Sequence, residues 1–261
     1  MPQAELSDRA LLRLSGPDTR GFLQGLLTQD VAALSPEQPL YAGLLSPQGK
    51  ALFQLFLFAD GEDVLLDAAA EDVEALAKRL SMFRLRKQVA IAPEPALAVW
   101  QSWGEGSAHP ADPRTPLAGS RYLAAPSGGP GALEGWHAHR LVLGLPDSDE
   151  IGRDELLWLE TNARELHGVS FAKGCYTGQE NTARMHHRDK LRKRLLPLRL
   201  SAESAPDAKV MAGEREAGQL RGTRHGDLQM AIFRMDYLAQ PLTVDGAAAQ
   251  MLVPAWLPAE G

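Results

Sequence analysis

The alternation of hydrophobic and polar residues near the N-terminus predicts a strand, a helix and a hairpin. Residues 10–14 form an apolar run typical of a strand, and the break at 15–18 starts a helix. One face of that helix carries Phe22, Leu23, Leu26 and Leu27. Residues 41–45 and 50–58 predict two further strands, because the Ser-Pro-Gln-Gly sequence between them at 46–49 suits a type I turn.

The next stretch continues this mixture of elements. The turn at 60–61 leads to a short strand at 64–66, and residues 71–80 have the spacing of an amphipathic helix. The inward face of that helix is Val73, Leu76, Ala77 and Leu80. Strands are expected again at 87–91 and 97–103. Because strands and helices do not alternate regularly, the pattern indicates an α+β fold, not a βαβ one.

The C-terminal part of the chain has a different sequence pattern, with loops and short β-like runs. Glycine- and proline-rich loops are expected at 104–119 and 126–131. Short β-like runs follow at 196–200, 229–234, 242–244 and 250–253. Glycines separate these runs, which is typical of a small barrel or sandwich. We therefore expect an N-terminal α+β subdomain at 1–103, a second α+β subdomain at 104–196, and a β-barrel at 197–261 with its boundary near Pro197.

Composition and charge limit the classes of function. The net charge of −6 argues against general nucleic-acid binding. No apolar run approaches the ~20 residues that span a bilayer, and residues 1–8 show no signal peptide, so no membrane association is expected. The single cysteine cannot form an internal disulfide. This fits a reducing compartment, and we expect a cytoplasmic protein.

The candidate chemistry centres on residues 173–180, Lys-Gly-Cys-Tyr-Thr-Gly-Gln-Glu, which contain that cysteine. Thr177 and Glu180 have the spacing of a capping box, so a helix is expected to begin at Thr177 and to continue through Arg184. Cys175 would then lie beside the positive end of the helix, with Lys173 nearby. These conditions favour the thiolate form of a cysteine.

The same segment has features of a ligand site. Gly174 and Gly178 would let the backbone approach a ligand closely, and the helix start could hold a carboxylate or phosphate. A lone cysteine is more often a small buried hydrophobic residue. The two flanking glycines and Lys173 favour the functional interpretation of Cys175.

Positive charge is concentrated directly after this segment. Between residues 184 and 199 the chain carries Arg184, Arg188, Lys190, Arg192, Lys193, Arg194 and Arg199 against Asp189, together with His186 and His187. Charge runs are most often solvated faces. The alternative is a patch that binds an acidic partner, and the position of the run keeps that alternative open.

The residues quoted above resemble a known family. Residues 173–180 are similar to the signature of the YgfZ family of folate-binding proteins, which are relatives of the glycine-cleavage T-protein (aminomethyltransferase). Residues 182–187 and 191–195 resemble its Iba57 (CAF17-like) branch of iron–sulfur cluster assembly factors. The similarity extends through residues 14–18, 22–31, 45–50, 83–86, 160–162 and 168–171.

The resemblance implies a fold and a role. The fold would be a T-protein-like α+β body, with ferredoxin-like subdomains around a central folate-sized cavity and a C-terminal β-barrel. The role would be tetrahydrofolate-linked maintenance of 4Fe–4S proteins, which in bacteria affects radical enzymes that modify tRNA. The implied partners are iron–sulfur assembly proteins of the A-type carrier class and client iron–sulfur enzymes, without direct nucleic-acid binding.

The resemblance also assigns roles to individual residues. The candidate catalytic residues are Cys175 and Lys173. The candidate cofactor-binding residues are Trp136, Gly174, Tyr176, Gly178, Gln179, Glu180 and Arg184. Trp136 is expected either to stack on the pterin of tetrahydrofolate or to be a core aromatic residue. T-protein relatives carry a glutamate before Gly144, where this chain has Val142 and Leu143.

Three functions follow from these residues. A self-contained cluster needs about four ligands, so Cys175 would give one ligand to a transient cluster shared with a partner, or act as a redox-sensitive nucleophile. The leading hypothesis is therefore a tetrahydrofolate-binding accessory protein for assembly, insertion or repair of 4Fe–4S clusters. The alternative is a tetrahydrofolate-dependent aminomethyltransferase or demethylase, for which Asp60, Asp63 and Asp67 are the nearby aspartates. A third hypothesis is a binding module that uses the basic run.

Overall fold

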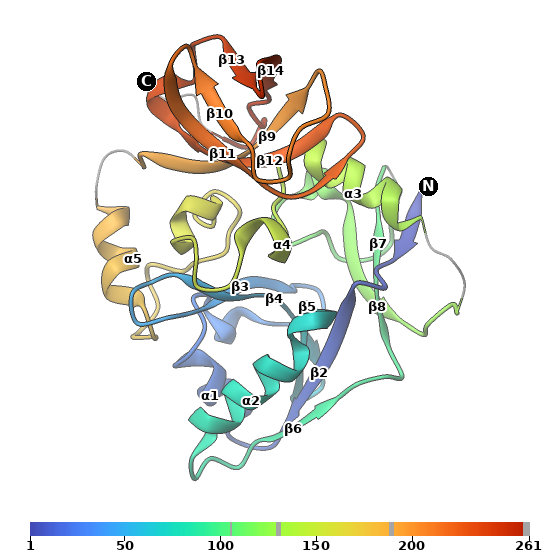
Figure 1. Cartoon of the computed structure of the whole chain (residues 1–261). Helices are drawn as coiled ribbons and strands as arrows, with labels where there is room; N and C mark the ends of the chain where they lie inside the picture. Colours follow the sequence, from blue (N-terminus) through green and yellow to red (C-terminus); the bar gives the residue numbers. More distant parts are fainter. Residues whose placement is uncertain (105, 129–131, 188–190, 258–261) are drawn as a thin grey trace.

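The computed structural model describes residues 1–104, 106–128, 132–187 and 191–257, and its strands form two open sheets and a closed barrel (Figure 1). The larger open sheet has five antiparallel strands in the order β3-β4-β5-β2-β6. Its strands are β2 (Arg9–Ser15), β3 (Leu40–Leu45), β4 (Ala51–Asp60), β5 (Asp63–Ala69) and β6 (Ala90–Pro93). Two helices, α1 (Thr19–Gln24) and α2 (Val73–Arg84), contribute to the core with this sheet.

Both faces of the five-stranded sheet are covered. Leu12 and Leu14 of β2 belong to the core shared with α1 and α2, whereas Leu11 belongs to the central core of the molecule. This separation follows from the strand period of two, which sends alternate side chains to opposite faces. Every residue of β3 is buried, as expected for a strand covered on both sides.

The smaller sheet and its neighbouring helices lie between the five-stranded sheet and the barrel (Figure 1). Its strand order is β1-β7-β8, formed by β1 (Gln3–Glu5), β7 (Ala98–Ser102) and β8 (Ser120–Ala124). The remaining helices are α3 (Leu133–Val142), α4 (Ser148–Ile151) and α5 (Gln179–His186), the last at the left edge of Figure 1. Short 3-10 turns occupy Val31–Ala33, Ala70–Asp72, Pro116–Ala118, Trp158–Thr161 and Met235–Tyr237.

The C-terminal strands close into a six-stranded barrel, at the top of Figure 1. In barrel order they are β10 (Lys209–Ala212), β11 (Arg215–His225), β12 (Leu228–Arg234), β9 (Lys193–Leu200), β14 (Ala247–Met251) and β13 (Leu242–Val244). The apolar interior includes Leu198, Val210 and Phe233, which are fully buried. Closure pairs every strand edge of the barrel, which removes the exposed edges of an open sheet.

The α+β class and the C-terminal barrel agree with the sequence analysis, and several boundaries differ. Strand β6 begins at Ala90, three residues after the predicted start, because a turn in which the Lys87 amide bonds the Arg84 carbonyl occupies that stretch. Strand β14 spans 247–251 instead of 250–253. Pro197 lies inside β9, so the barrel's first strand begins at Lys193, before the predicted boundary.

None of the helices in the described part of the chain has the length and hydrophobicity needed to traverse a bilayer.

Candidate functional site

The segment 173–180 connects the core to helix α5, and its first residue anchors it. Lys173 is buried, and its ammonium donates to the carbonyls of Gln24, Leu27 and Gln29 at 2.8, 2.6 and 2.9 Å. These carbonyls lie at the end of α1 and just beyond it, where the helix leaves backbone oxygens without intrahelical partners. Burial lowers the pKa of Lys173 to about 8, and the nearby charge of Asp30 opposes that shift.

The far end of the segment is held against the β3–β4 turn. Gly178 has a φ of +84°, and a Cβ placed there would lie 2.6 Å from the Ser46 carbonyl oxygen. Asn181, in the first turn of α5, donates from Nδ2 to the Gln48 carbonyl at 2.8 Å. The β3–β4 turn thus fixes the start of α5 through its close contact with Gly178 and its hydrogen bond with Asn181.

The capping-box prediction is wrong. The N-cap of α5 is Gly178, not Thr177, and no side chain caps it. The left-handed backbone at Gly178 starts the helix at Gln179, which places Glu180 too early in the helix to complete the reciprocal bond that a capping box needs. The helix does continue through Arg184, as expected.

Cys175 lies between these two anchors and is exposed as a free thiol. Gly174 is exposed beside it, and open space surrounds its α-carbon on the side where a Cβ would stand. Tyr176, in contrast, is buried and packs in the central core, with its ring centroid 5.2 Å from the Lys173 ammonium. Lys173 and Tyr176 therefore point inward and hold the loop, while the thiol of Cys175 faces solvent.

The other candidate residues of the segment are on the surface side of α5. Gln179 and Glu180 occupy its first turn, and Glu180 is exposed. Arg184 is exposed and donates from Nη2 to the Asn181 side chain at 2.6 Å. The structure thus brings seven of the candidates together in residues 173–180, with Arg184 one turn further along α5.

Trp136 lies apart from this segment, in helix α3. Its side chain is 1% exposed, and its ring centroid lies 5.9 Å from that of Trp103 and 6.1 Å from that of His139. The guanidinium carbon of Arg114 lies 5.9 Å from the ring centroid of Trp136. Trp136 is thus enclosed by other side chains, and a ligand ring could stack on it only by displacing these neighbours.

The basic run after residue 184 does not form a uniform free surface. Arg194 is buried, and its guanidinium donates to the Asn162 side chain at 3.1 Å and to Glu165 at 3.0 Å. Arg199 forms an ion pair with Asp227. Arg192 and Lys193 are exposed. The remaining members, Arg188, Asp189 and Lys190, lie outside the described residues.

A buried group of charges occupies the space between the five-stranded sheet and the three-stranded sheet. Asp67 of β5 accepts from Arg9 of β2 at 2.7 Å and from Arg121 of β8 at 2.8 and 2.6 Å. All three side chains are at most 1% exposed. Nearby, Arg114 is buried with Asp112 as its partner. The sequence analysis did not identify these interior charges as a buried group.

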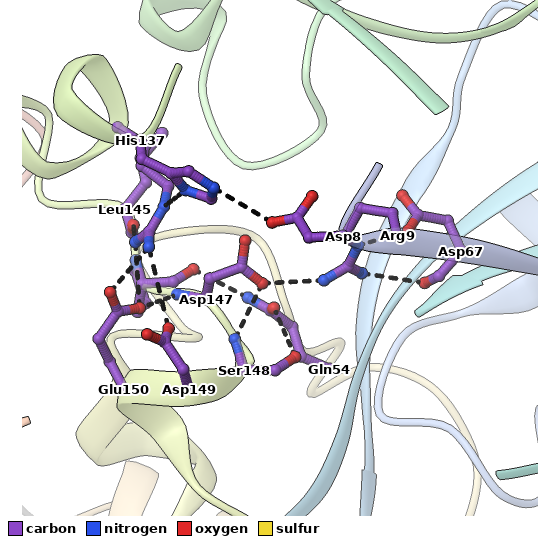
Figure 2. Close-up of polar contacts among 12 residues, drawn as sticks. Asp8, Arg9, Gln54, Asp67, His137, Leu145, Asp147, Ser148, Asp149 and Glu150 are labelled. Carbon is purple, nitrogen blue, oxygen red and sulfur yellow. Dashed lines mark hydrogen bonds and ion pairs between the residues drawn. The ribbon is translucent and has the colours of Figure 1, made fainter. Parts of the chain in front are cut away.

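An open space adjoins this charged group at the junction of sheet, helices and barrel. This junction cavity has a volume of about 370 Å³. It is lined by Asp8, Arg9, Ala69, Ala70, Glu71, His137, Arg140, Asp147, Ser148, Asp149, Thr223 and His225. Asp147 accepts from Arg9 at 2.8 Å, and Arg140 donates to both carboxylate oxygens of Glu150 at 3.0 and 2.8 Å (Figure 2). Burial by itself would raise the pKa of Asp147, but Arg9 and Arg140 hold it well below its usual range.

Within the described residues, no group of three or more His, Cys, Asp or Glu side chains is placed to hold a metal ion. His186 and His187 follow each other in and after α5, and the ring of His186 stacks on Phe171 with centroids 3.6 Å apart. The imidazole of His186 is thus engaged with an aromatic ring.

The comparisons with known proteins now bear on this arrangement. Residues 192–259 match the model of the CAF17 C-terminal beta-barrel domain, which covers the barrel seen here. The chain is 32% identical to the iron-sulfur cluster assembly factor IBA57, mitochondrial, of Homo sapiens over 97% of its own length and 84% of that protein. The chain belongs to the IBA57 family of iron–sulfur cluster assembly factors. The Mus musculus member is 33% identical, over 97% of this chain and 84% of that protein.

A solved structure supports the fold of the IBA57-family chain. The crystal structure of glycine cleavage system aminomethyltransferase T from Bartonella henselae superposes with a TM-score of 0.76. It covers 98% of this chain and 86% of that one, at 14% identity, which establishes the aminomethyltransferase-like fold alone. The names of the two IBA57 relatives place them in mitochondria, which does not support the cytoplasmic expectation.

Proposed function

We propose that this chain acts in the assembly, insertion or repair of 4Fe–4S clusters on client proteins, with Cys175 as the residue that meets the cluster. The observation that carries the proposal is an exposed thiol on a firmly anchored loop, in a chain that aligns with IBA57 proteins over 97% of its length. Three carbonyl acceptors hold Lys173, and the β3–β4 turn holds Gly178, so the position of Cys175 is fixed. A preorganised ligand costs less entropy to bind than a mobile one.

The cluster is cargo in this proposal, shared with another protein. The chain has one cysteine, and a cluster takes about four ligands, so a partner must supply the others. Partners of the A-type carrier class and client iron–sulfur enzymes would provide those ligands. Lys173 supports this step by positioning the loop, because its three N–H bonds are all directed at backbone carbonyls.

The test is a Cys175→Ser substitution in cells that lack the native protein. We expect client 4Fe–4S enzyme activity to stay at the level of cells without the protein, because a hydroxyl is a poor iron ligand. The thiol is exposed, so the variant should keep the thermal unfolding midpoint of the wild type. Ala172→Ser, an exposed change in the same loop, is the matched control and should restore activity. Full activity with Cys175→Ser at equal protein level would refute the role of the thiol.

The aminomethyltransferase-like fold favours a second candidate function, one-carbon transfer on tetrahydrofolate. The surroundings of Trp136, the missing glutamate and the nearby aspartates do not favour it. Trp136 is enclosed by core side chains, and Val142 stands half-exposed where relatives carry a glutamate. Asp67 is neutralised by two arginines, while Asp60 and Asp63 pair with Arg13 near the surface. No folate-dependent step is therefore derived from this chain.

A titration of the purified protein with tetrahydrofolate tests this candidate. We expect no saturable change in tryptophan fluorescence that depends on Trp136, because the indole has no open face. Wild type and Trp136→Phe should therefore give the same response, measured beside free tryptophan to correct for absorption by the ligand. Saturable quenching that disappears in Trp136→Phe would instead establish folate stacking at this residue.

A further inference from the structure

The end of helix α2 presents an unusual surface. Residues 81–88, named here the α2 tip, are exposed without interruption. Three of them are large and apolar: Met82, Phe83 and Leu85 are 68%, 38% and 86% exposed. Single exposed apolar residues are common on proteins, whereas three large ones within one eight-residue stretch favour a contact surface.

The backbone of the α2 tip is held in a strained form. Leu85 ends the helix with a φ of +50° and a ψ of −115°, a backbone conformation that favours glycine. A non-glycine residue is strained in this conformation, and such strain is concentrated at functional sites. Arg84 donates from Nη1 to the Val89 carbonyl at 3.1 Å, and the Gln88 amide donates to Asp18 at 2.7 Å. These hydrogen bonds hold the exposed Leu85 in a defined position.

Positive charge surrounds these apolar side chains. Between Glu74 and Glu94 the sequence contains Lys78, Arg79, Arg84, Arg86 and Lys87 and no acidic residue. The guanidinium carbon of Arg79 lies 5.3 Å from the centroid of the Phe83 ring. The carboxylate of Asp18 accepts a hydrogen bond from the backbone amide of Gln88. In a chain of net charge −6, this basic and apolar tip is a local exception.

We propose that the α2 tip binds an acidic segment of a partner protein, one that carries apolar side chains between its carboxylates. The charges of the tip complement such a segment, and arginines pair with carboxylates in a two-bonded geometry. A membrane surface fits less well, because interfacial helices bury a whole apolar face in lipid. The apolar face of α2, with Leu76 and Leu80, is already buried in the core with the sheet.

The proposal is tested with the full chain and a fluorescein-labelled peptide in which glutamate alternates with leucine and phenylalanine. Anisotropy should rise saturably and the affinity should fall with added salt. Leu85→Ser is expected to weaken binding by roughly tenfold or more, as for a central interface residue. The double variant Arg86→Glu/Lys87→Glu should weaken it similarly. The equal charge change Arg192→Glu/Lys193→Glu, at exposed residues beside the barrel, should leave the affinity unchanged.

Controls separate the competing occupants of the tip. The same peptide with lysine in place of glutamate should not bind. Binding that persists unchanged in the Leu85→Ser and Arg86→Glu/Lys87→Glu variants overturns the proposal, as does no saturable binding at all. Tip-dependent binding to phosphatidylserine–phosphatidylcholine vesicles without peptide binding would identify a lipid surface instead. Tip-dependent dimerisation in sedimentation, again without peptide binding, would identify a second copy of the chain. Each of these outcomes is independent of the Cys175 test, since all substituted residues lie outside segment 173–180.

Discussion

Replacing Asp67 by asparagine is expected to lower the free energy of unfolding by about 3–5 kcal/mol, the cost of breaking a buried ion pair from one side. Asp67 is fully buried and accepts hydrogen bonds from both Arg9 and Arg121. Burial lowers the pKa of Arg121, and the charge of Asp67 opposes that effect. An asparagine keeps the size of the side chain but removes the charge that both guanidinium groups need. Asp147 would remain as the other acidic partner of Arg9.

Urea unfolding followed by circular dichroism measures this loss. The matched control is Asp60→Asn, which makes the same chemical change in an ion pair with Arg13 where the aspartate side chain is 54% exposed. That control should change the free energy of unfolding by less than about 1 kcal/mol, because solvent screens exposed pairs. Equal effects of the two substitutions would mean that water reaches the Asp67 group and that the interior is not closed.

The hydrophobic pattern predicts most of the N-terminal elements because each apolar run is local. The hairpin of β3 and β4 and the inward face of α2 follow from spacing and turn residues alone. Strand β11 was not predicted, since its sequence, Arg-Glu-Ala-Gly-Gln-Leu-Arg-Gly-Thr-Arg-His, is polar. It is a strand because β10 and β12 pair with it on both sides. Tertiary pairing thus overrides its low strand propensity.

The burial and pairing of the charged residues could not be predicted from the sequence. Arg9 and Asp67 are separated by 58 positions, and Arg121 and Asp67 by 54. A charged residue in a sequence is normally assigned to the surface, and only the pairing of distant segments makes its burial affordable. The local sequence places Asp60 at a turn, but it does not show that Asp67 is buried between two arginines, whereas Asp60 and Asp63 pair with Arg13 near the surface.

The contacts of the segment 173–180 could be predicted only in part. The spacing of residues 173–180 identified the exposed Cys175, but Lys173 was expected to add charge beside the thiol. Its ammonium instead binds carbonyls 144 to 149 positions earlier in the chain. This contact depends on how α1 packs against the loop, so it cannot be read from the motif. The surroundings of the two glycines could not be predicted from the motif either. A Cβ at Gly174 would meet open space, whereas a Cβ at Gly178 would meet the distant β3–β4 turn.

Gly178→Ala is expected to destabilise the protein by about 2–4 kcal/mol, through left-handed backbone strain and a steric clash. The new Cβ would lie 2.6 Å from the Ser46 oxygen and 2.9 Å from the Leu45 Cβ. The turn cannot easily yield, because the Gly49 amide donates to the Ser46 carbonyl and the Ser46 amide donates to the Lys50 carbonyl, both at 2.9 Å. The start of α5 must therefore move, and the Cys175 loop with it.

Gly174→Ala is the matched control, since it makes the same change four residues earlier in the same segment. A Cβ at Gly174 meets nothing within 4 Å, and its φ lies outside the left-handed region. Its effect on the free energy of unfolding should stay within about 0.5 kcal/mol, as for an ordinary surface position. Urea unfolding of both variants, with client 4Fe–4S enzyme activity measured in cells, separates them: Gly178→Ala should lose stability and activity together. If Gly178→Ala is as stable as Gly174→Ala, the β3–β4 turn does not fix the loop, and the anchored thiol on which the proposed function depends loses its support.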